Sequence, residues 1–296
     1  MTTVHLIDGT YELFRYFYAP RMGFTNAGGR EVGAVRGVLG SLLTLVADGA
    51  THVGVATDHV IPSFRNDLFV GYKTGEGIDP VLEQQFVLLE DVLAAAGFVV
   101  WPMVELEADD ALASAARVAA ADPTVDEVLI CTPDKDLGQC LVHPKIKQLD
   151  RRANVVRDGE GVREKFGVPP ESIPDYLGLV GDTADGIPGI AGWGAKSAAV
   201  VLSRYGHLEN IPLDTSWDVT VRSQDKLRAT LSSHFDDAMA YRQLATLRYD
   251  AAVGEPAAWC WPAAPVEPTH RAIEELQAPN LVRRLTQLVA ARPPQF

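Results

Sequence analysis

Nine acidic residues could do chemistry together, because most of them follow a predicted strand or begin a predicted helix. They are Asp8, Asp58, Glu107, Asp109, Asp110, Asp134, Asp136, Asp182 and Asp185. All nine offer oxygen donors without an accompanying cluster of His or Cys, which favours Mg²⁺ or Mn²⁺ over Zn²⁺. Nine carboxylates exceed what one such ion needs, so we expect two or more ions, some held through water. Two hard cations that bridge one phosphate activate water and stabilise the leaving oxygen, which is the chemistry of phosphodiester hydrolysis.

The elements that must position these acids alternate between strands and helices. Hydrophobic periodicity predicts strands at 3–7, 52–57, 98–101, 127–132 and 146–149, and helices at 32–47, 81–96 and 108–121. This alternation predicts an α/β fold whose parallel sheet is covered by helices on both faces. Ligands bind such sheets beyond the carboxyl ends of the strands. Asp8, Asp58 and Asp134 each follow a predicted strand, so we expect them at that edge.

The acids also have simpler structural explanations. A single Asp after a strand is usually a turn former or a helix cap. Glu107, Asp109 and Asp110 open a helix, where capping and the helix dipole favour acids. One acid would satisfy that need, whereas three acids within four positions repel one another unless a cation is present. Metal ligation is therefore the interpretation we carry forward.

Two further segments add carboxylates. If residues 132–136 are extended, Asp134 and Asp136 point to one side and Lys135 points away, because side chains alternate along an extended chain. Asp182 and Asp185 lie in a Gly-rich stretch that, taken alone, is an ordinary loop.

Composition restricts the location and the binding partners that can be expected for the chain. The chain has 296 residues, three scattered cysteines and a formal net charge of −13. We expect a cytoplasmic location, since three scattered cysteines fit a reducing compartment, no apolar run is long enough for a membrane span, and the N-terminus does not resemble a signal peptide. The negative charge argues against binding nucleic acid, unless the acids are gathered around metal ions.

The pattern changes after about residue 168, where strands give way to helices. We expect an α/β domain at 1–168 and a mainly helical region at 169–296, with a last helix at about 270–291. The turn at 189–194 leads into a helix and exposes backbone N–H groups at its positive end, which makes a phosphate site. Lys196 and Arg204 could add charge, although such a turn can also simply join two helices.

Taken together, these motifs resemble the bacterial 5′–3′ exonuclease and flap endonuclease family, in a stand-alone form of the 5′ nuclease domain that begins bacterial DNA polymerase I. The resemblance covers roughly residues 3–250. It rests on Leu6–Gly9, Phe64–Arg65, Tyr72–Lys73, Glu107–Asp110, Thr132–Asp136, Gly181–Asp182, Asp185–Gly189 and Tyr241–Thr246.

The resemblance implies a fold, a ligand set and a substrate. The fold would be a PIN-like sheet followed by a helix–two-turn–helix element, and all nine acids match metal-ligand positions. Lys73, Asp134 and Asp136 would be catalytic, with Lys73 contacting the scissile phosphate. The predicted DNA-binding residues are Gly189, Gly192, Trp193, Gly194, Lys196, Ser197 and Arg65, and K⁺ could be bound at the turn. The substrates would be 5′ flaps, nicks and 5′ ends of DNA in replication and repair. The protein would act as a monomer and would not associate with a membrane.

One segment departs from the family pattern. Between residues 66 and 103 the only Lys or Arg is Lys73, and Gly71, Gly75 and Gly77 are poor helix formers. This is where the family carries a basic helical arch that guides the 5′ strand, so we expect a loose or reduced arch.

Three alternatives stay open at this point. The first is a structure-specific DNA-binding protein that cuts weakly because its arch is depleted. The second is a PIN-type ribonuclease, which shares the acid-rich sheet. The third is a Mg²⁺-dependent phosphatase for small molecules, which would not need the 189–197 turn.

Overall fold

The computed structural model describes residues 1–20 and 23–292. The chain forms two compact units that are interleaved along the sequence. Unit 1 contains Met1–Ile61, Gly75–Thr132 and the residues from Tyr249 onward, and unit 2 contains Pro62–Thr74 and Pro133–Arg248. The boundary expected at residue 168 would divide the chain into two consecutive segments, whereas each unit is made of separate segments. The expected boundary stays a prediction.

Unit 1 is built on four parallel strands, β1 (Thr3–Asp8), β2 (His52–Asp58), β3 (Val99–Met103) and β4 (Glu127–Cys131), in the order β3-β2-β1-β4. The central strands are mostly apolar and largely buried, as expected for a sheet covered on both faces. In the register Asp8 lies opposite Ala56, and Asp58 opposite Met103. The strands therefore deliver Asp8 and Asp58 to the same edge.

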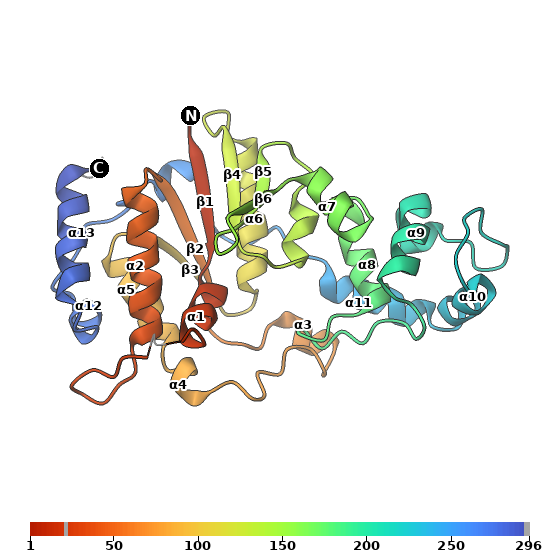
Figure 1. The fold of residues 1–296 in the computed structure, drawn as a ribbon, viewed down its shortest axis with the longest axis horizontal. Coiled ribbons are helices and arrows are strands. Elements are labelled where there is room, and N and C mark those ends of the chain that lie inside the picture. Colours follow the sequence, from red (N-terminus) through yellow and green to blue (C-terminus); the bar gives the residue numbers. More distant parts are fainter. Residues whose placement is uncertain (21–22, 293–296) are drawn as a thin grey trace. The chain divides into compact units, whose positions relative to one another are not determined.

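The helices of unit 1 are α1 (Gly9–Phe17), α2 (Gly33–Ala47), α4 (Pro80–Glu83), α5 (Phe86–Ala95), α6 (Ala108–Ala121), α12 (Arg271–Glu275) and α13 (Pro279–Ala291). Of these, α1, α5 and α6 pack directly against the strands. The helices expected at 32–47 and 108–121 are confirmed, and α13 packs along α2 (Figure 1). Sequence analysis did not predict α1, which begins directly after Asp8.

Two expected helices are each divided in the structure. The helix expected at 81–96 is interrupted at 84–85, where the Gln84 carbonyl accepts a hydrogen bond from Arg30 at 2.6 Å. The helix expected at 270–291 is divided at Gln277, whose φ of 50° lies in the left-handed region, and restarts at Pro279. Both divisions depend on contacts or backbone angles that periodicity does not report.

Residues 249–262, which follow α11 in the sequence, return to unit 1 and lie along β2. Cys260 forms a bridge with His52, and Trp259, in the 3₁₀ helix η4 (Pro256–Trp259), packs its ring against Trp101. Trp259 is fully buried, so this Trp-rich segment belongs to the core.

Unit 2 contains a short hairpin and a helical bundle. The hairpin pairs β5 (Ile146–Asp150) with β6 (Val155–Arg157) in antiparallel fashion. Strand β6 was not predicted. The helices are α3 (Phe64–Leu68), α7 (Gly159–Phe166), α8 (Ile173–Val180), α9 (Ala195–Tyr205), α10 (Gln224–Ser233) and α11 (Phe235–Ala245), with the 3₁₀ turns η1 (Asp136–Cys140), η2 (Pro170–Ser172) and η3 (Leu208–Asn210).

The bundle has its own apolar core, in which α8 packs against α9 and α11. Its members include Leu177, Leu179, Val201, Leu202 and Leu244. The predicted class, a mostly parallel sheet flanked by helices and followed by a helical region, is confirmed. Between Leu68 and Pro80 the chain forms turns and bends without a helix, in the stretch where we expected a reduced arch.

Candidate active site

Asp8 ends β1 and begins α1. One of its carboxylate oxygens accepts from the backbone N–H of Tyr11 at 2.8 Å and caps α1, and the other accepts from the Thr132 hydroxyl at 3.0 Å. Asp8 is therefore a helix cap, which is the structural role considered for an Asp that follows a strand. The carboxylate is nevertheless held at the carboxyl end of the central strand, where both contacts fix its direction.

Asp58 ends the neighbouring strand β2 and is tied to the start of α6. Its Oδ1 accepts from the N–H of Ala108 at 2.8 Å, while its own N–H donates to the Thr10 hydroxyl at 2.8 Å. Behind it, the buried Glu90 accepts from the hydroxyl of Thr57 and the ring Nδ1 of His59, both at 2.7 Å. The two residues that flank Asp58 are thus anchored to one carboxylate.

The acids at the start of α6 form a capping box. The N–H of Glu107 donates to Asp110 Oδ2 at 3.0 Å, and the Glu107 side chain accepts from the backbone of the first turn. Glu107 and Asp110 are buried and Asp109 is half-buried. Capping therefore accounts for part of this motif, as the structural explanation proposed. It does not account for burying two carboxylates side by side.

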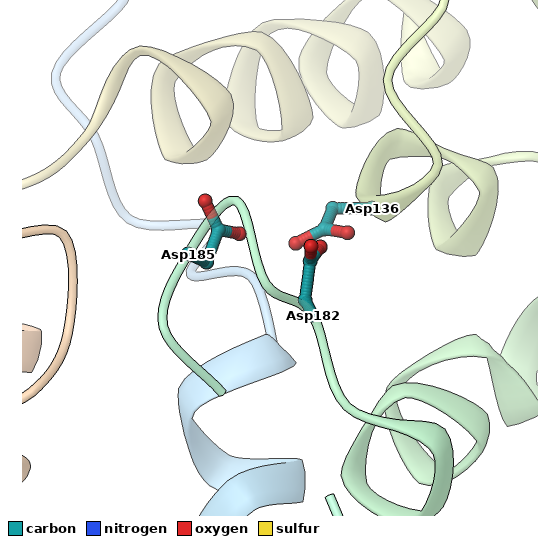
Figure 2. Close-up of side chains that lie close together, drawn as sticks. All are labelled: Asp136, Asp182 and Asp185. Carbon is teal, nitrogen blue, oxygen red and sulfur yellow. The ribbon is translucent and has the colours of Figure 1, made fainter. Parts of the chain in front are cut away.

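Unit 2 brings three predicted ligands together. Asp136 comes from η1, and Asp182 and Asp185 come from the loop after α8; one oxygen from each lies within 4.8 Å of the others. Figure 2 shows the carboxylates of Asp136 and Asp182 facing each other, with Asp185 beside them. All three residues are buried, and Asp136 is only 5% exposed. Asp134 belongs to the same loop as Asp136, whose N–H donates to Asp134 Oδ1 at 2.9 Å.

The loop that carries Asp182 and Asp185 is held closed by backbone contacts. Asp182 and Ile187 exchange two hydrogen bonds of 2.8 and 2.7 Å. At Gly186 the φ is 75°, and a Cβ there would lie 2.2 Å from the carbonyl oxygen of Gly71. Only glycine fits this close approach. The Gly-rich stretch that looked like an ordinary loop therefore has a specific shape.

Two lysines pair with the cluster. Lys73 Nζ lies 3.3 Å from Asp185, and Lys135 Nζ lies 2.7 Å from Asp182. The expectation that Lys135 points away from the acids is wrong. It assumed an extended loop, but the hydrogen bond from Asp136 N–H to Asp134 turns the chain into η1, so side chains no longer alternate.

A third negative charge in the cluster of Asp136, Asp182 and Asp185 is electrostatically unfavourable. Burial, followed by the nearby charges of Asp134, Asp185 and Asp182, raises the pKa of Asp136 well above its ordinary value, and only Lys73 opposes this. Burial lowers the pKa of Lys135, but its pairing with Asp182 outweighs burial and the net pKa is raised. Two lysines therefore do not neutralise the group.

The cluster fits a divalent cation. Asp136 Oδ1 is buried and has no hydrogen-bond partner, although buried carboxylate oxygens ordinarily have one. Three convergent carboxylates supply only oxygen donors, which suits a hard ion such as Mg²⁺ or Mn²⁺. In unit 1, Asp8 and Asp58 stand at the carboxyl ends of β1 and β2, and Glu107, Asp109 and Asp110 stand at the start of α6.

The predicted DNA-binding turn is a real N-terminal turn of α9. Gly194 caps the helix, with its N–H donating to the Ser197 hydroxyl at 3.1 Å. A cavity of about 680 Å³ opens beside it in unit 2. Its lining includes Gly192, Gly194, Lys196 and Ser197 from the predicted set, together with Arg222, Ser223 and Lys226. Sequence analysis did not select the last three, although the basic spacing of 222 and 226 was visible.

Two members of the predicted set are internal instead. Arg65 is 1% exposed, and its guanidinium donates to the carbonyls of Leu244 at 2.8 Å and Thr246 at 3.1 Å. Trp193 is buried and donates to the Leu227 carbonyl at 3.3 Å. The placement of both side chains does not support their selection as DNA contacts. Gly189 is likewise packed against the backbone of residues 180–181.

Comparison with known proteins decides the family. Residues 3–167 match the family model described as 5′–3′ exonuclease, N-terminal resolvase-like domain, and residues 168–263 match the one described as 5′–3′ exonuclease, C-terminal SAM fold. The chain belongs to the 5′–3′ exonuclease family. The resemblance drawn from the sequence motifs is thereby confirmed.

Individual members of the 5′–3′ exonuclease family show how far the likeness extends. A 5′–3′ exonuclease of Buchnera aphidicola is 36% identical over 208 residues, which covers 70% of this chain and 68% of that protein. DNA polymerase I of Rhizobium leguminosarum is 35% identical over 83% of this chain but only 24% of its own length. The chain thus spans about a quarter of that polymerase.

A solved structure supports the fold. The flap endonuclease of bacteriophage T5, in a complex with DNA and metal ions, matches 97% of this chain and 98% of its own with a TM-score of 0.63 and 19% identity. In the described part of the chain no helix is long and apolar enough to cross a membrane.

Proposed function

We propose that this protein is a divalent-metal-dependent 5′ nuclease that hydrolyses DNA phosphodiesters at 5′ flaps, nicks and 5′ ends, in replication and repair. The observation that carries the proposal is the buried cluster of Asp136, Asp182 and Asp185, with its unpartnered Oδ1. Membership of the 5′–3′ exonuclease family supports the reaction type.

The nine acids are proposed to hold two or more Mg²⁺ or Mn²⁺ ions. Such ions, when bound, supply the charge that polarises the phosphate and lowers the pKa of attacking water. Within unit 2 the ligands would be Asp134, Asp136, Asp182 and Asp185. Asp8, Asp58, Glu107, Asp109 and Asp110 would be the contribution of unit 1.

Lys73 is proposed to meet the scissile phosphate. Its Nζ already lies against the cluster through Asp185, and its N–H donates to the Asp185 carbonyl at 3.1 Å. Because the backbone already fixes Lys73 at this position, its charge can offset the negative charge that builds on the phosphate. No further ordering of the lysine is needed during the reaction. Lys135 pairs with Asp182 and offsets part of its charge.

The turn before α9 is proposed to hold the DNA backbone. Gly192, Gly194 and Lys196 line the cavity beside the turn, and Arg222 and Lys226 add positive charge to its lining. A helix N-terminus with nearby cations binds phosphate without reading sequence. A K⁺ ion at this turn and a monomeric state remain part of the proposal.

A second candidate is a structure-specific DNA-binding protein with weak cleavage. It is favoured by one observation: the chain between Leu68 and Pro80 forms no helix, and Lys73 is its only basic residue. On this view the metal cluster would be present but substrate strands would seldom be guided to it.

A substrate panel separates these functions. The wild-type protein would be incubated with a 5′-labelled DNA flap, a nicked duplex and an RNA hairpin of matched length, each with Mg²⁺, Mn²⁺ or EDTA. We expect incision of the flap and the nicked duplex with either ion and none with EDTA. Binding of the flap without incision under any ion would support the second candidate, and preferential cutting of RNA would overturn the proposal.

A further inference from the structure

A basic surface lies on unit 2 at the β5–β6 hairpin and α7. Seven of the chain's 26 Lys and Arg residues fall between positions 145 and 165, against four acids. They are Lys145, Lys147, Arg151, Arg152, Arg157, Arg163 and Lys165. In a chain whose net charge is −13, this is a local reversal of sign, and the proposed function described above does not use it.

Two of these cations are brought together by the fold. Arg157 ends β6, and its stem lies over Gly161 in the first turn of α7, where a Cβ would come within 2.5 Å of Arg157 Cγ. Lys165 lies four residues after Gly161 on the same helix face. The Arg157 stem over Gly161, with Lys165 one turn further along α7, therefore places both cations on one face of this helix.

The charges of Arg157 and Lys165 are not cancelled within the described residues. Arg157 donates to the side-chain oxygen of Gln148 at 2.9 Å, and Lys165 Nζ lies 4.8 Å from the centre of the Phe166 ring. Neither forms an ion pair with a carboxylate in the described part of the chain. Burial, followed by the charge of Arg157, lowers the pKa of Lys165, and the more weakly acting charges of Asp134 and Asp150 do not reverse this, so an anion between the two cations would relieve their repulsion.

The pair is attached to the loop that carries the metal ligands. Gln148 is buried, and its side chain has two partners: its oxygen accepts from Arg157, and its Nε2 donates to the carbonyl oxygen of Asp134. Arg157 is therefore one side chain away from the Asp134–Asp136 loop. A strand whose phosphate reaches that loop would have neighbouring phosphates within the range of both cations, since phosphates repeat closely along DNA.

We propose that Arg157 and Lys165 form a second site for a backbone phosphate of the DNA substrate, separate from the turn before α9. The inference rests on the proposed function. A guanidinium and an ammonium together suit a phosphodiester, which accepts bidentate and point-charge contacts. The pair also supplies positive charge that the stretch from 66 to 103 lacks, and so helps an acidic chain to hold a polyanion.

The test is the salt dependence of DNA binding. Binding of a fluorescent flap duplex would be measured in EDTA by anisotropy, for the wild type and for Arg157→Gln/Lys165→Gln. Loss of two phosphate contacts should make the slope of log affinity against log salt shallower by about 1.8, so that the variant loses roughly tenfold less affinity than the wild type between about 50 and about 200 mM salt.

The matched control is Arg283→Gln/Arg284→Gln on α13, which removes the same charge from unit 1. It should keep the wild-type slope, as should the conservative variant Arg157→Lys/Lys165→Arg. Melting temperatures check that each variant is folded.

The outcomes separate the two proposals. Equal slopes for the wild type and Arg157→Gln/Lys165→Gln, in a protein that cleaves flaps with Mg²⁺, would overturn this phosphate site and leave the nuclease proposal intact. An equal loss of slope in the α13 variant would also overturn it, because net charge alone would then explain the effect. A wild type that neither binds nor cuts the flap would refute both.

Discussion

Replacing Asp136 with asparagine should stabilise the metal-free protein, although it removes a side chain that we place at the metal site. Asp136 is buried, has an oxygen without a partner and faces Asp182 and Asp185. Asparagine keeps the shape, removes the charge and retains a hydrogen-bond acceptor. In the absence of metal the variant therefore loses a repulsion and little else.

The size of the effect follows from the geometry. At 4.8 Å, each pair of carboxylates repels by about 3.5 kcal/mol at an effective dielectric constant of about 20, or about 7 kcal/mol for the two pairs. The protein can avoid this by protonating Asp136. At a pH of about 7.5 that costs about 5 kcal/mol, at about 1.36 kcal/mol per pH unit above the ordinary pKa of 3.8. Protonation of Asp136 is the less costly of the two alternatives, and the nearby charge of Lys73 lowers the cost further. Replacing Asp136 with asparagine should therefore raise the free energy of unfolding by about 3–5 kcal/mol.

The sign of the pH dependence can be checked in the same variant. Because the pKa of Asp136 is raised in the folded state, the stability that it contributes is fully present below pH 3.8 and is lost as the pH rises through the raised value. The difference between Asp136→Asn and the wild type should therefore vanish at low pH and grow towards neutral pH.

Thermal melting in EDTA, followed by circular dichroism between about pH 4 and about pH 8, measures this effect. At a pH of about 7.5 the variant should melt roughly 5–15 °C above the wild type. Asp214→Asn, which neutralises an exposed acid of unit 2, should change melting by no more than about 2 °C. If Asp136→Asn melts at or below the wild-type temperature throughout, the cluster does not carry the repulsion described here.

Three further predictions concern groups around the two sets of acids. Lys135→Met should lower stability in EDTA by about 1–3 kcal/mol by leaving a buried carboxylate without its cation. Addition of Mn²⁺ should raise the melting temperature of this variant by more than it raises that of the wild type. Gly186→Ala should cost more than about 1 kcal/mol, because its Cβ would meet a backbone oxygen at 2.2 Å with φ at 75°; chemical denaturation would show this, and wild-type stability would contradict it. Glu90→Ala should cost about 1–3 kcal/mol by leaving Thr57 and His59 without their acceptor, whereas Glu90→Gln should cost less; equal melting of both variants and the wild type would refute the anchoring role.

The sequence predicted the parallel sheet and the strand-end acids because both follow from local patterns. Apolar runs that end in Asp8 and Asp58 become β1 and β2, and parallel pairing brings their ends to one edge. The Ala-rich run became α6 with the predicted bounds of 108–121. Period and strand direction are sufficient for such assignments.

The errors share a different cause, which is contact between residues far apart in the sequence. Arg65 is buried because the carbonyls at the end of α11 face it, about 180 residues later in the chain. The interruption at residues 84–85 reflects a carbonyl captured by Arg30. Lys135 pairs with Asp182, which the loop after α8 brings to it from a distant part of the chain. A pattern of residue types contains none of these partners.

The missed elements show a related limit. Strand β6 is three residues long and exposed, so it has no apolar period to detect. Its position matters because Arg157 pairs in register with Gln148, which joins the basic surface to the Asp134 loop. The sequence showed the basic residues but not this connection.

The most direct test of the central claim is single-turnover incision of a 5′-labelled DNA flap by the wild type and by Asp136→Asn, with enzyme in excess and Mg²⁺ present. We expect the wild type to cut near the flap junction and leave a 5′ phosphate, with no cutting in EDTA. Asp136→Asn should bind the flap and cut it at least about a hundredfold more slowly, which corresponds to about 2.7 kcal/mol of lost transition-state stabilisation. Incision by Asp136→Asn at the wild-type rate would contradict the assignment of the cluster as the metal-binding centre of a nuclease.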